Sequence, residues 1–327
     1  MKTFLNSTAL AALVLGIAAS ASPVAAQESL LFGAILKTPA NPHWNAMSQG
    51  ITDAAEEIGG IEVVVSTVAS EGAAEQQLNN CESMLLREPD ALIVGAINSN
   101  ILLPCLQRAT EQGIAIVDLD YNLDRVIAES AGVEVTFTAG NDGNDTGGVG
   151  ADFVVEQLGG EPSGPVLVIE GLPGNPVGAA RGEGFRARLA EIAPGLEVTT
   201  LNGDWDRGKS ADITNDTLQR TPDLQAVFAA NDTMALGAAE ALLAAGHDDV
   251  PVVGVDGSAD AIESIRSGRL TATVGQFPYL VGKRSVELLN DMIRNGGELD
   301  TYQGTGQSVI TQEVLEAGTD EMIQYLR

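Results

Sequence analysis

The chain has 327 residues and a formal net charge of −28, with only two histidines and two cysteines. So acidic a chain repels nucleic-acid phosphates and anionic lipid surfaces, which argues against both as partners. Its length is sufficient for two lobes with separate hydrophobic cores, because a single core stops growing at about 250–300 residues.

Residues 1–26 have the pattern of an export signal. Lys2 is their one charge, Ala9 to Ala19 form an apolar core, and Val24-Ala25-Ala26 supply small residues for cleavage before Gln27. The apolar run is shorter than the roughly 20 residues that a membrane-spanning helix needs. Neither cysteine lies near the cleavage point to carry a lipid anchor. We therefore expect an exported protein that is free in solution.

Between residues 30 and 119, apolar runs of strand length alternate with segments of helical spacing. The first strand, Leu30 to Leu36, leads through a polar turn to a helix, with Asn41 as N-cap and Pro42 as first helical residue. The pattern predicts strands at 30–36, 61–65, 91–96 and 114–119, and helices at 42–58, 73–87 and 101–112. Strands joined by helices predict an α/β fold with a parallel sheet covered on both faces.

The rhythm changes between residues 133 and 148, where a short strand is followed by a run rich in glycine and asparagine. We expect this run to be a flexible crossing between two lobes, near Ala139 to Asp145. The alternation then resumes, and an irregular tail follows it. It predicts strands at 166–170, 198–201, 226–230, 252–255 and 271–275, and helices at 150–158, 181–192, 210–219, 233–245, 259–267 and 280–294.

The two cysteines, Cys81 and Cys105, lie on the apolar sides of consecutive predicted helices. Consecutive crossover helices on one sheet face are neighbours, and an exported protein meets an oxidising compartment, so a disulfide between them is reasonable. Two buried free thiols are the alternative.

One stretch matches a phosphate-binding loop letter for letter. Residues 203–210, Gly-Asp-Trp-Asp-Arg-Gly-Lys-Ser, fit G-x-x-x-x-G-K-[ST] between a predicted strand and a predicted helix. However, Asp204 and Asp206 would lie among the phosphates, and an exported protein has no ready supply of nucleotide. The glycines at 171, 174 and 178 have the wrong spacing for a nicotinamide fingerprint. We expect no cofactor.

Catalytic and metal sites lack suitable residues. Only His43 and His247 could serve a catalytic triad, and His247 lies in an acidic turn where we expect a surface position. The predicted loops contain only scattered carboxylates and few histidines or thiols to bind a metal ion, so we expect no metal site. The composition still allows a glycoside hydrolase, in which Asp120 and Asp256 would face each other across a cleft and cleave a glycosidic bond. An exported carbohydrate-active hydrolase is therefore the alternative to a binding protein.

Polar and aromatic side chains gather at the predicted strand ends. Charged and amide groups make strong hydrogen bonds to hydroxyls, and flat aromatic rings cover C–H faces, so such a set suits a neutral polyhydroxyl ligand. Helix capping by the same Asp and Asn residues is the plainer explanation for each taken singly. The residues are Lys37, Asn41, Asp120, Asn231, Asp256 and Gln276, with Trp44 and Trp205.

At these residues the chain resembles the periplasmic sugar-binding proteins of the ribose-binding class, which are type I periplasmic binding proteins, and most closely the D-allose-binding branch. The resemblance covers essentially the whole chain after the signal. It rests on Lys-Thr-x-x-Asn-Pro-x-Trp at 37–44, Ser-Glu-Gly at 70–72, Asp-Leu-Asp at 118–120, Arg-Gly-Glu-Gly-Phe at 181–185, Asp-Trp-Asp-Arg at 204–207, Ala-Asn-Asp-Thr-Met-Ala at 230–235, Val-Gly-Val-Asp-Gly at 253–257, and Thr-Ala-Thr-Val at 271–274 with Gln276.

The resemblance implies a set of ligand-binding residues. His43 stands where relatives have phenylalanine, and Tyr121 where ribose binders have arginine, so the sugar is left open among hexoses, pentoses and sugar alcohols. The implied residues are Lys37, Asn41, His43, Trp44, Asp120, Tyr121, Arg181, Trp205, Asn231, Asp256 and Gln276.

The resemblance also implies two Rossmann-like lobes joined by a three-crossing hinge. The expected boundaries are 27–140 plus 278–305 for the N-terminal lobe and 141–277 plus 306–327 for the C-terminal lobe. The lobes would close on a monosaccharide or polyol, and the closed form would be recognised by the permease of an ABC transporter. We expect a monomer that is not an enzyme.

Overall fold

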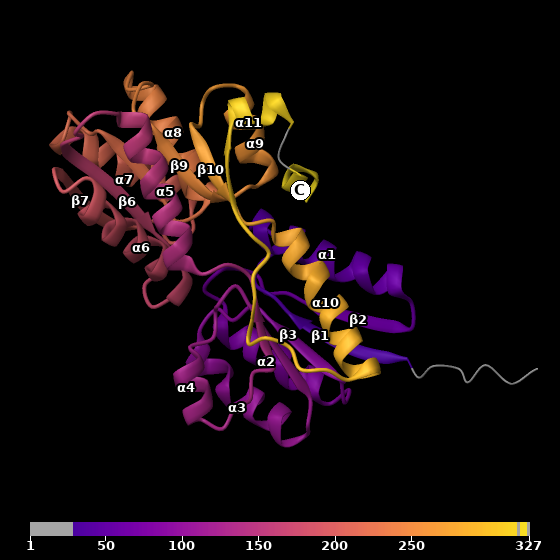
Figure 1. The fold of residues 1–327 in the computed structure, drawn as a ribbon. Coiled ribbons are helices and arrows are strands. Elements are labelled where there is room, and N and C mark those ends of the chain that lie inside the picture. The colour runs from indigo at the N-terminus through magenta and orange to yellow at the C-terminus, as the bar shows by residue number, and fades with distance from the viewer. Residues whose placement is uncertain (1–28, 319–320, 326–327) are drawn as a thin grey trace, which may run out of the picture.

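The computed structural model describes residues 29–318 and 321–325. The export signal expected at 1–26 lies outside the described residues. Figure 1 shows two lobes, each a sheet with helices on both faces. The predicted α/β class with two Rossmann-like lobes is confirmed.

The first lobe is built on six parallel strands in the order β11-β5-β4-β3-β1-β2. These are β1 (Leu30–Ile35), β2 (Ile61–Ser66), β3 (Ala91–Val94), β4 (Ala115–Leu119), β5 (Phe137–Ala139) and β11 (Tyr302–Gln303). One core lies between the sheet and helices α1 (Pro42–Ile58) and α10 (Pro278–Asn295). The other lies under α2 (Ala74–Leu85), α3 (Ser99–Glu111) and α4 (Arg125–Ser130).

The second lobe repeats this plan with the strand order β12-β10-β9-β8-β6-β7, in which β12 alone runs antiparallel. Its strands are β6 (Gly164–Glu170), β7 (Leu196–Asn202), β8 (Ala226–Ala229), β9 (Val252–Asp256), β10 (Ala272–Gly275) and β12 (Ser308–Thr311). Helices α5 (Gly143–Leu158) and α6 (Pro176–Ile192) cover one core. The other core lies under α7 (Arg207–Arg220), α8 (Asp232–Ala245), α9 (Ala259–Arg266) and α11 (Gln312–Ala317), and a 3-10 helix, η1 (Glu321–Tyr325), follows.

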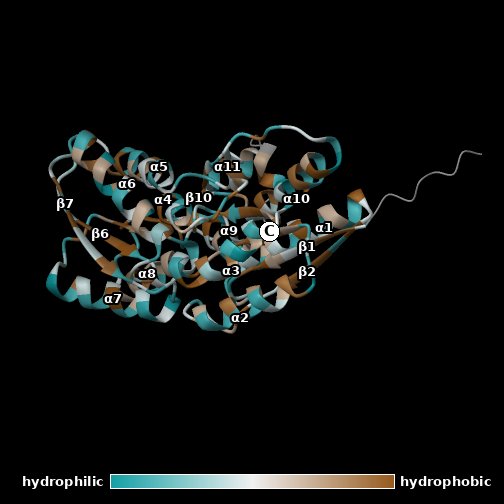
Figure 2. Cartoon of the chain, turned by 90° about the horizontal axis from the view of Figure 1, so that it is seen from below, coloured by the Kyte–Doolittle hydropathy of each residue, from teal (hydrophilic) through white to brown (hydrophobic). Residues whose placement is uncertain are grey.

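Apolar residues concentrate on the strands and on the inward faces of the helices, as Figure 2 shows, while the outer helix faces are polar. Within the described residues, no helix combines the length and the apolar character needed to cross a membrane.

The chain passes between the lobes three times, after β5, after β10 and after β11. The crossings are hydrogen-bonded to one another. The Asn141 side chain donates to the Gly306 carbonyl at 2.8 Å, and the Thr305 hydroxyl donates to the Gln276 carbonyl at 3.5 Å. Motion at one crossing is therefore coupled to the others.

Two expectations about local structure were wrong, and one helix was not predicted. The chain does cross between the lobes at the expected place, after β5, but the glycine-rich run is mostly helical, because α5 begins at Gly143 with Asp142 as N-cap. Its glycines allow a close helix contact rather than a turn: a Cβ atom on Gly147 would collide with the Arg181 carbonyl of α6. The tail is not irregular, since it contributes β11, β12 and α11, and the short α4 was not predicted.

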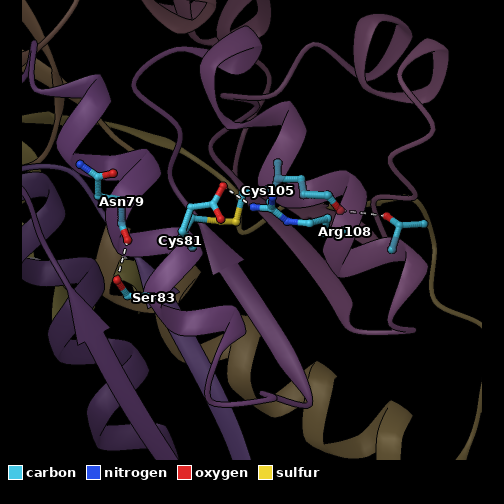
Figure 3. The surroundings of a disulfide bond; sticks show 8 residues. Asn79, Cys81, Ser83, Cys105 and Arg108 are labelled. Carbon is cyan, nitrogen blue, oxygen red and sulfur yellow. Dashed lines mark hydrogen bonds and ion pairs between the residues drawn. A yellow bond between two sulfur atoms is a disulfide. The ribbon is translucent and has the colours of Figure 1, made fainter.

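The predicted disulfide between Cys81 and Cys105 is present, with the two Cα atoms 6.3 Å apart. Figure 3 shows the bridge joining α2 to α3, with Arg108 beside it. Arg108 forms an ion pair with Glu82 of α2. The alternative of two free thiols is thereby excluded. The bridge fixes the outer pair of helices on one face of the first sheet.

Candidate functional site

The carboxyl ends of the parallel strands from both lobes face a common cleft with about 310 Å³ of empty space. The first lobe contributes Lys37, Asn41, His43, Trp44, Glu71, Asp120 and Asn122 to its lining, and the second lobe contributes Asn175, Val177, Arg181, Trp205, Asn231 and Asp256. All ligand residues expected from the sequence line this cleft except Tyr121 and Gln276.

The first turn of α1 is held at the cleft by its cap. The Asn41 side-chain oxygen accepts a hydrogen bond from the His43 backbone N–H at 3.1 Å, as predicted for an N-cap. The Asn41 amide group donates in turn to Glu71 at 2.8 Å. This anchoring presents His43 and Trp44 to the cleft, and the Trp44 ring fits there because Gly95 has no side chain.

Lys37, at the end of β1, is buried beside the Trp44 ring. Its Nζ donates to Asn122 Oδ1 at 2.7 Å and lies 4.8 Å from the centroid of the Trp44 ring. Burial lowers the pKa of Lys37 to about 8, although the charges of Glu71 and Asp120 oppose this. The lysine is thus a positioned donor whose charge depends on its carboxylate neighbours.

Asp120 and Asp256 occupy equivalent places, because β4 and β9 are each third in the order of their sheet. Both have positive φ angles, 57° and 121° respectively. Such backbone costs about 1–3 kcal/mol outside glycine and persists only where the surroundings hold it. Burial would raise the pKa of Asp120, but the charges of His43 and other nearby cations lower it below its usual value, so this carboxylate is ionised.

Beneath each of these aspartates lies a second buried carboxylate that does not line the cleft. Asp118 accepts a hydrogen bond from the Thr138 hydroxyl at 3.3 Å. Asp232 accepts one from the Thr273 hydroxyl at 2.6 Å and another from the Ser258 backbone N–H at 2.7 Å. Burial raises the pKa of both carboxyl groups.

His43 lies between the two cleft aspartates, which come from different lobes. Its Nε2 is 2.5 Å from Asp120 Oδ2, and its Nδ1 is 3.3 Å from Asp256 Oδ1. The imidazole is edge-on to the Trp44 ring, with centroids 5.1 Å apart. The side chain is 5% exposed, so these groups replace water around it.

Arg181 of α6 fixes Asp256 from the second lobe. Its guanidinium donates to Asp256 Oδ1 at 3.2 Å, to the Ala230 carbonyl at 2.7 Å and to Gln276 Oε1 at 2.6 Å. Gln276 donates to the Thr146 hydroxyl at 2.6 Å. Gln276 therefore lies behind the arginine, where it orients the guanidinium instead of lining the cleft.

Trp205 lies within the stretch that matches a phosphate-binding loop, and it packs against glycine. A Cβ atom on Gly171 or Gly178 would collide with the Trp205 ring or crowd it. Lys209 of the motif pairs with Asp204, and the Lys209 backbone N–H is capped by Asp206. The groups that would hold a phosphate are thus occupied by carboxylates.

Tyr121 does not line the cleft, contrary to its expected place among the ligand residues. Its ring stacks on Tyr302 of β11, with centroids 5.4 Å apart and an interplanar angle of 4°. The positive φ of Tyr121, 55°, directs the chain away after Asp120. The aromatic stack therefore belongs to the crossing region.

Four lining residues were not proposed from the sequence: Glu71, Asn122, Asn175 and Val177. A signal for Asn175 was available, because Asn175-Pro176 starts α6 as Asn41-Pro42 starts α1, each after the first strand of its lobe. Glu71 lies in the Ser-Glu-Gly motif at 70–72, but nothing local shows that it reaches Asn41.

Several buried polar atoms in the cleft have no hydrogen-bond partner. They are His43 Nδ1, Asp120 Oδ1, Arg181 Nε and Asn231 Nδ2. Buried polar groups are nearly always paired, so this set calls for a ligand that both donates and accepts. No group of three or more His, Cys, Asp or Glu residues in the described part of the chain could hold a metal ion.

Comparisons with known proteins agree with this geometry. A family model described as "Periplasmic binding protein domain" matches residues 32–298. The chain is 35% identical over 285 residues to the D-allose-binding periplasmic protein of Escherichia coli, covering 86% of this chain and 90% of that protein. It is 32% identical to the ribose import binding protein of Bacillus subtilis, covering 82% and 83% respectively.

Among solved structures, the chain is similar to a periplasmic solute-binding protein of an ABC transporter from Actinobacillus succinogenes, determined with bound D-allose. The TM-score is 0.81 and the sequence identity 29%, and the match covers 89% of this chain and all (100%) of that one.

Proposed function

Because the chain belongs to the periplasmic binding protein family, we propose that it is the receptor of an ABC importer and binds a neutral monosaccharide or sugar alcohol between its lobes. The observation that carries this proposal is the set of unpaired polar atoms in the cleft between Trp44 and Trp205. Three of these atoms can donate and one accepts. A hydroxyl group does both, so a polyhydroxyl ligand satisfies all of them.

The charges in the cleft support a neutral ligand. Arg181 is paired with Asp256, and His43 contacts both Asp120 and Asp256. Lys37 and Glu71 also line the cleft, so the lining carries charges of both signs. A charged ligand would meet like charge as well as opposite charge and would have to be desolvated. The empty space of about 310 Å³, which includes the open mouth of the cleft, is small and favours a single sugar ring over a longer chain.

Hydrolysis by Asp120 and Asp256 is not supported. A glycosidase needs one carboxyl group that stays protonated as general acid. The pKa of Asp120 is lowered by the charge of His43, and Asp256 is bound by Arg181. The family is one of binding proteins and not of enzymes.

The cellular setting is part of the proposal. Relatives named for D-allose and ribose import are periplasmic or import-binding proteins, and residues 1–26 read as an export signal. We infer that the protein is a periplasmic monomer whose closed form is recognised by the transporter permease. Size-exclusion chromatography with light scattering tests the monomer.

The experiment that tests the ligand class is a thermal-shift screen against D-allose, D-ribose, other pentoses and hexoses, and sugar alcohols. A ligand of the native state raises the melting temperature by mass action. We expect one or a few neutral sugars to do so, with calorimetry giving one site per chain. Shifts with charged metabolites only, or turnover of glycosides, would overturn the proposal.

The matched variants are Asp256→Asn in the cleft and Asp260→Asn on the exposed surface of α9. Loss of a charge-assisted partner should weaken binding by about 100-fold for the first. The second should bind as the wild type does. Equal affinity of both variants would remove Asp256 from the site.

A further inference from the structure

His43 connects carboxylates that belong to different parts of the molecule. His43 and Asp120 are carried by the first lobe, whereas Asp256 follows β9 in the second lobe. The imidazole contacts Asp120 through Nε2 and faces Asp256 through Nδ1. The contact between Nδ1 and Asp256 therefore exists only while the lobes are closed.

The hydrogen-bonding capacity of the two carboxylates determines which form of the imidazole suits this position. An ionised carboxylate only accepts hydrogen bonds, and a neutral imidazole has one N–H and one lone pair. A neutral His43 would thus point its lone pair at one of two acceptors. The charge of Lys37 helps to lower the pKa of Asp120, and Arg181 donates a hydrogen bond to Asp256, so each carboxyl group faces a second cation.

From this geometry we propose that His43 is an imidazolium in the closed protein, and that closure of the lobes on a sugar takes up a proton at this residue. The inference rests on the proposed function for the identity of the ligand. A ligand hydroxyl that lies against Nδ1 and donates its own proton to Asp256 offers only its oxygen to the imidazole. Nδ1 must then carry a proton to donate to that oxygen.

The pKa of His43 agrees with this assignment. Burial lowers it, but the charges of Asp120 and Asp256, together with the hydrogen bond to Asp120, outweigh this and raise the pKa to about 10. When the lobes open, the contribution of Asp256 is lost and water reaches the ring, so the pKa falls below about 10. Asp120 belongs to the same lobe as His43 and stays in contact, so the pKa of the open form remains above the usual value of about 6.5.

The difference in the His43 pKa between the closed and open forms makes closure depend on pH. The closed form holds the proton more tightly, so the stabilisation of closure is complete below the pKa of His43 in the open form and is lost as the pH rises toward about 10. Between these limits the apparent affinity should fall by about tenfold per pH unit. Other charges near the ring are Lys37, Glu71 and Arg181. Burial lowers the pKa of Lys37 to about 8, which falls within this range.

Calorimetry at pH 8 tests the proposal directly. The best sugar from the screen is titrated into the whole protein in phosphate and in Tris, whose ionisation enthalpies differ. The difference in heat gives the number of protons bound per sugar. We expect the wild type to take up more protons per sugar than His43→Gln, with His247→Gln equal to the wild type. Subtracting the variant removes any contribution of Lys37.

A second measurement does not depend on the sugar. Because the chain has two histidines, NMR of the imidazole groups in wild type and in His247→Gln resolves the titration of His43. We expect its midpoint well above that of His247. Equal proton uptake in wild type and His43→Gln, or coinciding midpoints for the two histidines, would overturn the proposal. If no sugar binds, the proposed function fails and the NMR titration alone decides this inference.

Discussion

The carboxylate of Asp232 fills the space that a side chain on Gly254 would need. Gly254 pairs with Thr273 of β10, just as Asp118 pairs with Thr138 of β5 in the other lobe. In the first lobe the buried carboxylate thus comes from the strand itself, whereas in the second it reaches in from α8. In both lobes, therefore, a buried carboxylate accepts a hydrogen bond from a threonine of the neighbouring strand, below the aspartate that lines the cleft.

This acceptor supports the strained turn that presents Asp256. The Thr273 hydroxyl donates to Asp232 and accepts from the Gly257 N–H at 3.2 Å. Removing the hydroxyl in Thr273→Val leaves two buried groups unpaired, so we expect a loss of about 1–3 kcal/mol in the free energy of unfolding, together with weaker sugar binding. Thr273→Ser keeps the hydroxyl and should resemble the wild type. Urea denaturation and calorimetry measure both effects, and a serine variant as impaired as the valine one would contradict the hydrogen-bond argument.

Asp232 should make stability depend on pH. Burial, with the charge of Asp256 adding to it, raises the pKa of Asp232 to about 7, against about 3.9 in the unfolded chain. The native state therefore binds the proton more tightly, and the stability that this provides is complete below about pH 3.9 and lost as the pH rises to about 7. Asp232→Asn, which keeps the shape and one acceptor, should lose less stability than the wild type over this range. Melting temperatures at pH 5 and pH 7 test this, and parallel curves for the two proteins would refute it.

Two adjacent glycines of α5 should respond in opposite ways to alanine. A Cβ on Gly147 would collide with the Arg181 carbonyl and the Phe185 amide, whereas a Cβ on Gly148 meets nothing within 4 Å. We expect Gly147→Ala to destabilise by about 1–3 kcal/mol through forced separation of α5 and α6. Gly148→Ala should stabilise by about 0.5–1 kcal/mol, because alanine favours helix. Chemical denaturation of both variants provides the comparison, and similar changes in stability would mean that the helix contact is not tight.

The disulfide should contribute to stability through the unfolded chain. Cys81 and Cys105 are separated by 24 residues, and closing a loop of that size is worth about 3 kcal/mol. The double variant Cys81→Ala/Cys105→Ala should lose about this amount, and a reductant should destabilise the wild type but leave the variant unchanged. A variant that remains sensitive to the reductant would show that the effect has another origin.

Much of this architecture could be predicted because buried parallel strands are continuous apolar runs. The same geometry brings their carboxyl ends together, so polar residues such as Asp120, Asn231 and Asp256 could be assigned to one cleft from their positions after strands. Local pattern was sufficient for both the elements and the general place of the site.

The failures have a common physical cause, which is that the deciding contact is distant in sequence. Glycines at the start of α5 resemble a flexible turn until α6 is known to lie against them. Tyr121 turns away because Tyr302 is available to stack on it. Gln276 lies behind Arg181 because Thr146 holds its amide group. Tyr302 and Thr146 are each more than 100 positions away from the residue that they contact. Only α5 and α6 are neighbours in the sequence.

The short segment from Tyr302 to Thr311 supplies the edge strand of both sheets, β11 to one and β12 to the other. Neither lobe can therefore complete its sheet from a continuous piece of chain. Such long-range pairing is slow to form. Until this segment docks, β5 and β10 remain open sheet edges of the kind that recruit other chains. The two lobes consequently finish folding together, and the interval before that step is when the protein is most exposed to aggregation.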